Sequence, residues 1–155
     1  MMVSILRQEL DSLIRAVYLS SLDDAVERQR LINQTLDGDR WTVETAKGKS
    51  KPLTDREMVE MCNEIFGWTE IVYDFGCSLV HLSDLHGVTN DKDMEDFFPL
   101  EISKDMVLQY LHDFHDGPNS DNPTLEDLSE YFPKVLKKIA DNLEFYLKEI
   151  EAKEE

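Results

Sequence analysis

The sequence predicts an all-α protein, an antiparallel bundle of four to five main helices in a single domain over residues 1–155. Apolar residues recur at helical spacing over long stretches, and Ser or Thr capping sequences precede several of them. Glycine and proline are scarce, with 6 and 5 copies. A chain of 155 residues that is 41% hydrophobic is long enough to bury one substantial core.

The first helix is expected over residues 4–36, and its pattern blurs near residues 20–24, which allows a bend there. Its apolar stripe consists of Val3, Leu6, Leu10, Leu13, Ile14 and Val17. Residues 38–53 contain glycine and are rich in polar residues, so we expect an exposed loop or short hairpin. The basic cluster of this loop, interpreted as solvated, consists of Lys47, Lys49 and Lys51.

A capping-box sequence marks the next helix start. Thr54 and Glu57 place a hydroxyl and a carboxylate three residues apart, where they satisfy free amide groups of a first turn. The residues that follow, 55–85, are expected to form two helices that break at Gly67 and pack end to end. Ser103 is then expected to cap a shorter helix that stops near Gly117.

The last helix has the clearest amphipathic pattern of the chain. Thr124 and Asp127 resemble a second capping box, and Pro133 suits a first helical turn. Glu144 and Lys148 are spaced to pair on the outer face. The apolar face is expected to consist of Leu136, Ile139, Leu143, Tyr146, Leu147 and Ile150.

The charge limits the function classes. With 33 acidic and 16 basic residues the net charge is −17, which disfavours generic nucleic acid binding because phosphate contacts need a basic surface. No apolar run is long enough to span a membrane, and the N-terminal sequence does not resemble a signal peptide, so a cytoplasmic protein is expected. Cys62 and Cys77 are too few for a disulfide framework and are interpreted as buried free thiols.

One helical segment combines an apolar face with residue types used in metal and acid–base sites. The apolar face includes His86, which we expect to be largely buried. The polar stripe on the other side consists of Glu70, Asp74, Cys77, His81 and Asp84. The stripe is either a site built in the bundle or the solvated face of a surface helix, and the second interpretation is preferred.

No cofactor or metal is expected. His112 and His115 are weak candidates for a pair of metal ligands, since they are three residues apart on one helix, but partly buried histidines at the helix edge are the favoured interpretation. The sequence contains no HExxH, GxSxG or paired-cysteine zinc spacing, and its GKS and DKDMED segments lack the rest of a phosphate loop or an EF-hand.

The segments RQELDSLIRAVYLSS, ERQRLI and YDFGCSLVHLS resemble those of uncharacterised bacterial helical proteins distantly similar to the HEPN superfamily (higher eukaryotes and prokaryotes nucleotide-binding). The positions of the resemblance are Glu9, Arg15, Tyr73, Ser78 and His81. It implies an up-and-down bundle, frequent homodimers and, in active members, a metal-independent ribonuclease of toxin or phage-defence systems. Active members have an Arg followed four to six residues later by His, and this sequence has no such pair.

The favoured hypothesis is therefore a non-catalytic bundle that acts through contacts with an unidentified protein partner and forms a homodimer, with an enzymatic role disfavoured. Ile5 and Leu19 lie outside the main stripe of the first helix and are the expected interface residues. The alternative is a divergent HEPN-like ribonuclease or toxin component that uses His81 with Arg7 or Arg15. Its remaining candidate residues are Tyr73 and Ser78. A metal-binding bundle is the third hypothesis.

Overall fold

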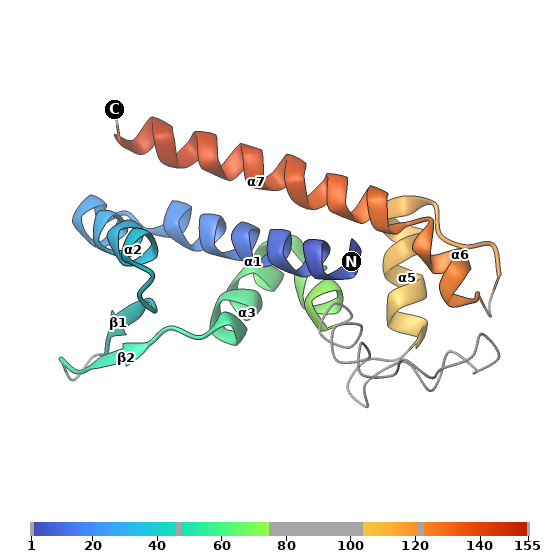
Figure 1. The fold of residues 1–155 in the computed structure, drawn as a ribbon, viewed down its shortest axis with the longest axis horizontal. Coiled ribbons are helices and arrows are strands. Elements are labelled where there is room, and N and C mark those ends of the chain that lie inside the picture. Colours follow the sequence, from blue (N-terminus) through green and yellow to red (C-terminus); the bar gives the residue numbers. More distant parts are fainter. Residues whose placement is uncertain (1, 46–47, 75–103, 121–122, 155) are drawn as a thin grey trace.

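The computed structural model describes residues 2–45, 48–74, 104–120 and 123–154 (Figure 1), and this part of the chain is predominantly α-helical, as the sequence predicts. Besides a two-stranded antiparallel sheet of β1 (Thr42–Glu44) and β2 (Ser50–Pro52), its elements are helices. They are α1 (Met2–Ser21), α2 (Ala25–Asp37), α3 (Asp55–Phe66), α5 (Lys104–His115), α6 (Leu125–Ser129) and α7 (Phe132–Glu154).

The expected bend near residues 20–24 is a complete break between α1 and α2. The carboxylate of Asp24 accepts hydrogen bonds from the backbone amides of Val26 at 2.9 Å and Glu27 at 3.3 Å, so it caps a new helix. Gly38 ends α2 in the left-handed conformation, with φ of 76°.

The segment between α2 and α3 is a hairpin, in which Val43 is the register partner of Lys51. Lys49 and Lys51 are exposed, as expected, and Lys47 lies outside the described residues. Trp41 departs from the expectation of an exposed segment. It is only 2% exposed, and its indole Nε1 donates a hydrogen bond to Thr35 Oγ1 at 2.7 Å, which anchors the hairpin to α2.

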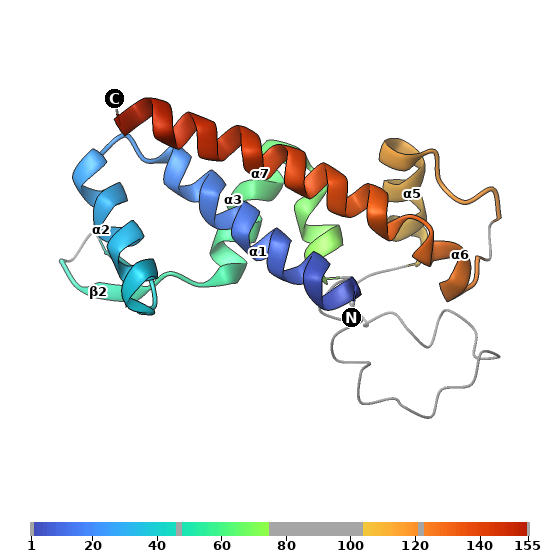
Figure 2. The ribbon, with the colours of Figure 1, turned by 45° about the horizontal axis from the view of Figure 1, so that its top comes forward.

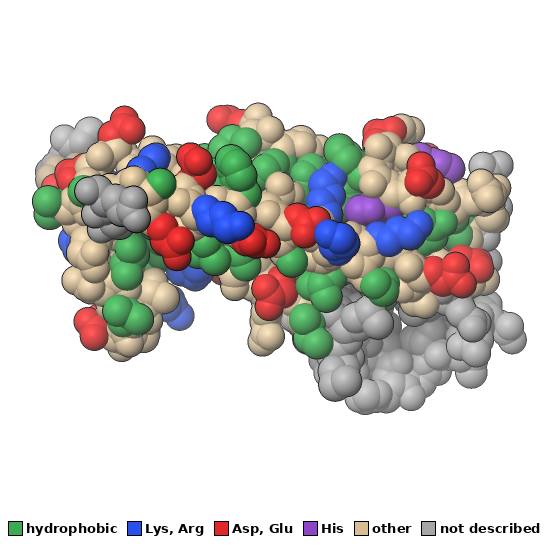
Figure 3. Space-filling model, turned by 90° about the horizontal axis from the view of Figure 1, so that it is seen from above, with side chains coloured by type: hydrophobic (Ala, Val, Ile, Leu, Met, Phe, Trp, Pro, Cys, Tyr) green, Lys and Arg blue, Asp and Glu red, His purple; other side chains and the backbone are tan. Residues whose placement is uncertain are grey.

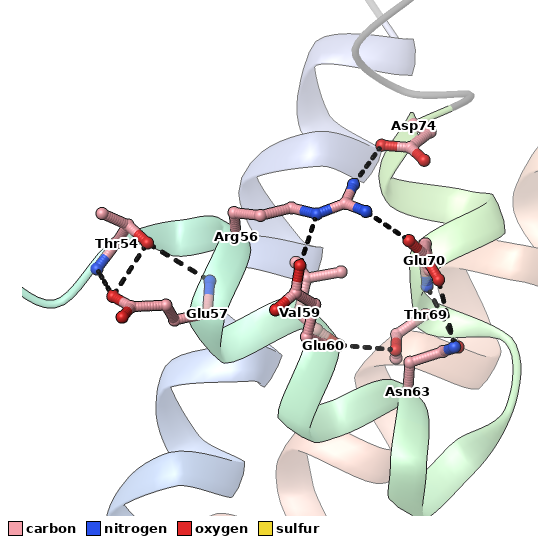
Figure 4. Close-up of polar contacts among 9 residues, drawn as sticks. All are labelled: Thr54, Arg56, Glu57, Val59, Glu60, Asn63, Thr69, Glu70 and Asp74. Carbon is pink, nitrogen blue, oxygen red and sulfur yellow. Dashed lines mark hydrogen bonds and ion pairs between the residues drawn. The ribbon is translucent and has the colours of Figure 1, made fainter. Parts of the chain in front are cut away.

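The capping box of α3 is confirmed, and so is the break at Gly67, where φ is 69°. Residues 69–74 are helical again. They turn back beside α3 instead of extending from its end (Figure 4), so the end-to-end expectation is wrong. Because of this reversal, polar groups on the new helix face polar groups on α3.

The second capping box, Thr124 with Asp127, is confirmed at the start of α6. In α7 the Glu144–Lys148 ion pair is confirmed at 2.5 Å, and Ile139 and Ile150 are buried. The expectation for Leu147 is wrong, since it is 48% exposed. Among the described residues, Leu147 therefore lies on a part of the stripe that no other helix buries.

The core lies where α1 is packed between α7 and α3, and α7 is its most extensive partner. Figures 1 and 2 both show α7 lying along α1, with the two C-terminal ends together. Lys153 Nζ donates a hydrogen bond to the carbonyl of Ser20, which confirms that orientation. The antiparallel arrangement expected for the bundle therefore does not hold for this pair, which runs parallel. The α1 residues of the core are Leu6, Leu10, Leu13, Ile14 and Val17.

Candidate functional site

Two members of the polar stripe, Glu70 and Asp74, are described, and both pair with one arginine of α3 (Figure 4). The guanidinium of Arg56 lies 2.5 Å from Glu70 and 3.5 Å from Asp74, and it also pairs with Glu60 at 3.0 Å. These hydrogen bonds and charges raise the pKa of Arg56, with the bond to Glu60 as the largest cause. Glu70 also accepts a hydrogen bond from Asn63 Nδ2 at 3.3 Å.

Glu70 and Asp74 are thus partly exposed carboxylates that share one guanidinium. A carboxylate already paired with a guanidinium is a poor ligand for a metal cation, because the ion would have to displace the arginine. The other members of the stripe, Cys77, His81 and Asp84, lie outside the described residues. The same holds for Ser78, a candidate of the ribonuclease hypothesis, and for His86, which was expected to be buried. Among the residues that are described, no group of three or more His, Cys, Asp or Glu side chains is placed to hold a metal ion.

The two α1 arginines considered for catalysis have different surroundings. Arg15 donates to Asp55 at 3.2 Å, and its guanidinium lies 4.9 Å from the centre of the Trp41 ring. Arg7 pairs with Asp11, and its guanidinium stacks 3.7 Å above the ring of Tyr73. The structure thus brings Arg7 to Tyr73, the first residue of the Tyr-x4-Ser-x2-His stretch. Arg15 instead forms an ion pair with Asp55 at the start of α3.

The two histidines of α5 do not share one environment. His112 is exposed, whereas His115 is 7% exposed and its Nε2 lies 2.9 Å from the hydroxyl of Tyr110. Burial is the largest cause that lowers the pKa of His115, and the charges of Lys138 and Lys134 add to it. The expectation of partly buried histidines at the helix edge is therefore wrong for His112, which is exposed, while His115 is buried more fully than expected. The lysines near His115 oppose a metal cation there.

Lys138 lies among aromatic rings at the α5–α7 contact, a feature that the sequence analysis missed. Its Nζ is 3.2 Å from the centre of the Phe114 ring and 4.8 Å from that of Trp68. Burial lowers the pKa of the ammonium group to about 8. The sequence signal was the four-residue spacing of Lys134 and Lys138, whereas the rings around Lys138 come from residues distant in sequence, Phe114 of α5 and Trp68.

Several large apolar side chains are exposed. On α7, Phe145 is 56% exposed and packs edge-on against Tyr146, which packs edge-on against Phe66 of α3. Of the two residues expected in a dimer interface, Ile5 is 41% exposed. Leu19 is partly buried against the core of its own chain, whereas it was expected to be left over for a dimer interface.

Comparison with protein families, curated proteins and solved structures gives no match to this chain. In the part of the chain that the structure describes, no helix is both long and apolar enough to cross a membrane. The function therefore has to be argued from the surfaces and contacts described above.

Proposed function

We propose that this protein is a non-catalytic helical bundle that acts through protein–protein contacts, and that its first partner is a second copy of itself. The observation that supports this proposal is the exposed end of the aromatic series formed by Phe66, Tyr146 and Phe145. An exposed aromatic ring in contact with partly buried rings offers apolar area at little cost in side-chain entropy, as interface residues do. Ile65, which precedes Phe66 on α3, is also exposed, at 53%.

The charge adds a property that distinguishes such a dimer from other complexes. Two copies with a net charge of −17 repel each other, and salt screens that repulsion. An apolar interface between copies should therefore tighten as salt rises. A complex held by a basic partner should weaken under the same change.

Sedimentation velocity at several salt concentrations tests the proposal. We expect the wild-type protein to self-associate at micromolar concentration, more strongly at about 500 mM than at about 50 mM NaCl. Phe145→Asp should abolish association, and Leu36→Ser, which changes an exposed apolar residue on α2, should leave it unchanged. A wild-type protein that is monomeric at both salt concentrations, or equal association of both variants, contradicts the proposal.

The free thiol of Cys62 fits a reducing compartment, so we place this function in the cytoplasm. Its burial raises the pKa of the thiol to about 12, so it stays protonated and inert.

One contact favours a second candidate, the divergent ribonuclease. Arg7, stacked on Tyr73, brings a cation to the start of the stretch that contains Ser78 and His81. Under this alternative the arginine stabilises negative charge on a phosphate in the transition state, and His81 transfers the proton. Cleavage of single-stranded RNA that is lost in Arg7→Ala and in His81→Ala, and kept in the exposed control Arg40→Ala, would establish it. Equal residual cleavage in all three variants would indicate a contaminating nuclease.

A further inference from the structure

We propose that His115, Lys134 and Lys138 form a binding site for a phosphate group carried by a small molecule. The three residues meet where α5 ends and α7 begins. His115 is the last residue of α5, and the two lysines are one helical turn apart on α7. Lys134 Nζ donates a hydrogen bond to the carbonyl of His115 at 3.2 Å, which ties the two helices together. Figure 3, which views the α7 side, shows histidine and lysine side chains gathered over the first half of that helix.

The orientation of the His115 ring leaves one nitrogen for a ligand. Burial raises the pKa of Tyr110, so its hydroxyl stays protonated and can donate to Nε2. The ring proton of neutral His115 is then on Nδ1, which becomes a hydrogen-bond donor. Within the described residues Nδ1 makes no hydrogen bond, and no fully buried side-chain nitrogen there lacks a partner. Nδ1 is therefore not completely buried, although His115 as a whole is only 7% exposed.

The charges at this place lack a partner of opposite sign. Lys137 and Lys148, on the same helix, pair with carboxylates at 2.6 and 2.5 Å. In the described part of the chain no carboxylate oxygen lies within 4.0 Å of Lys134 or Lys138. Among the described residues, the negative charge of Asp116 acts on His115 and is opposed by the positive charges of Lys134 and Lys138. Lys134 and Lys138 are therefore two ammonium groups without an ion-pair partner among the described residues of a protein whose net charge is −17.

The donors suit a dianion. Two ammonium groups and one ring N–H supply charge-assisted hydrogen bonds, which phosphate oxygens accept well. A metal cation is repelled by the same lysines. The ring of Phe114, 45% exposed and in contact with Lys138, lies beside the donors and offers a surface for an aromatic group attached to the phosphate.

The test is a titration of the folded chain with inorganic phosphate and with phenyl phosphate, at constant ionic strength set with NaCl. The side-chain nitrogen resonances of His115 report binding. We expect saturation with a millimolar dissociation constant and a rise in the pKa of His115, because a bound dianion favours the imidazolium. Tighter binding of phenyl phosphate would assign an aromatic phosphate ester, and equal binding would assign free phosphate.

Variants separate the site from general screening. Lys134→Met and Lys138→Met remove the ammonium group and keep an unbranched side chain only one atom shorter, and each should weaken binding at least about fivefold, the loss of about 1 kcal/mol. Lys148→Met removes a paired charge from the same helix and should leave binding unchanged. Circular dichroism confirms that each variant is folded. The proposal is overturned if no saturable shift occurs up to about 20 mM of either phosphate, or if the doubly substituted protein binds as well as the wild type.

Discussion

Truncation of Ile139 to alanine measures how much the contact between α1 and α7 contributes to stability. Ile139 is fully buried in the core cluster. The substitution removes three carbon atoms, worth about 2.4 kcal/mol in transfer free energy at about 0.8 kcal/mol each. The cavity left between two helices raises the expected loss of unfolding free energy to about 3–4 kcal/mol.

Leu147→Ala is the matched control, because it removes the same number of carbon atoms from the same helix. Leu147 is 48% exposed, so about half of the transfer term applies, no cavity forms, and the expected loss is about 1 kcal/mol. The sequence pattern alone places both residues on one apolar face and predicts similar losses. The two substitutions therefore distinguish the observed packing of α7 from the pattern.

Urea unfolding followed by circular dichroism at low protein concentration provides the measurement. With a slope of about 2 kcal/mol per molar urea, the midpoint should fall by about 1.5–2 M for Ile139→Ala and by about 0.5 M for Leu147→Ala. The slope should not change. Equal shifts of the two midpoints would refute the orientation of α7 described above.

Three further predictions follow from individual contacts. Thr54→Ala removes the capping hydroxyl of α3 and should cost about 1 kcal/mol of unfolding free energy, whereas Thr54→Ser should cost little, as urea unfolding of both variants will show. The pKa of Glu57 is lowered to about 2, chiefly by Lys51, so its stabilisation is complete above pH 4.5 and is lost as the pH falls towards 2. Thermal unfolding should show that Glu57→Gln removes part of this acid dependence, and an unchanged pH profile would contradict the assignment. In a Cys77→Ser background, Cys62 should react with a thiol reagent only after unfolding, so its reaction rate should rise with urea.

The local parts of the fold were predictable from the sequence. Thr54 with Glu57, and Thr124 with Asp127, satisfy backbone amides within one turn, so their geometry depends on nothing distant. Gly67 likewise ends a helix by its own backbone conformation.

The direction and packing of the helices were not predictable in the same way. Helical periodicity is identical for parallel and antiparallel neighbours, so the apolar stripes of α1 and α7 do not show that the two helices run parallel. Periodicity also places Leu147 on the stripe, although the described part of the chain leaves it 48% exposed.

The candidate site depends on partners that are distant in sequence. The spacing of His112 and His115 suggests a ligand pair, but the environment of His115 is set by Lys134 and Lys138 of another helix. Glu70 is paired with Arg56 only because the chain reverses at Gly67. Sequence patterns identify residues whose side chains could bind a metal or transfer a proton. Only the fold shows which of these side chains already pair with another residue of the chain.

The parallel pairing of α1 with α7 also affects how the protein is made. More than 100 residues separate the end of α1 from the start of α7. At a synthesis rate of about 5–20 residues per second, the apolar face of α1 waits about 5–20 s for its main partner after it leaves the ribosome. The helix pair that dominates the core is thus the last to form, and contacts this distant in sequence fold slowly. During synthesis the nascent chain exposes Leu10, Leu13 and Ile14, a surface that chaperones recognise and that favours aggregation when chaperones are scarce.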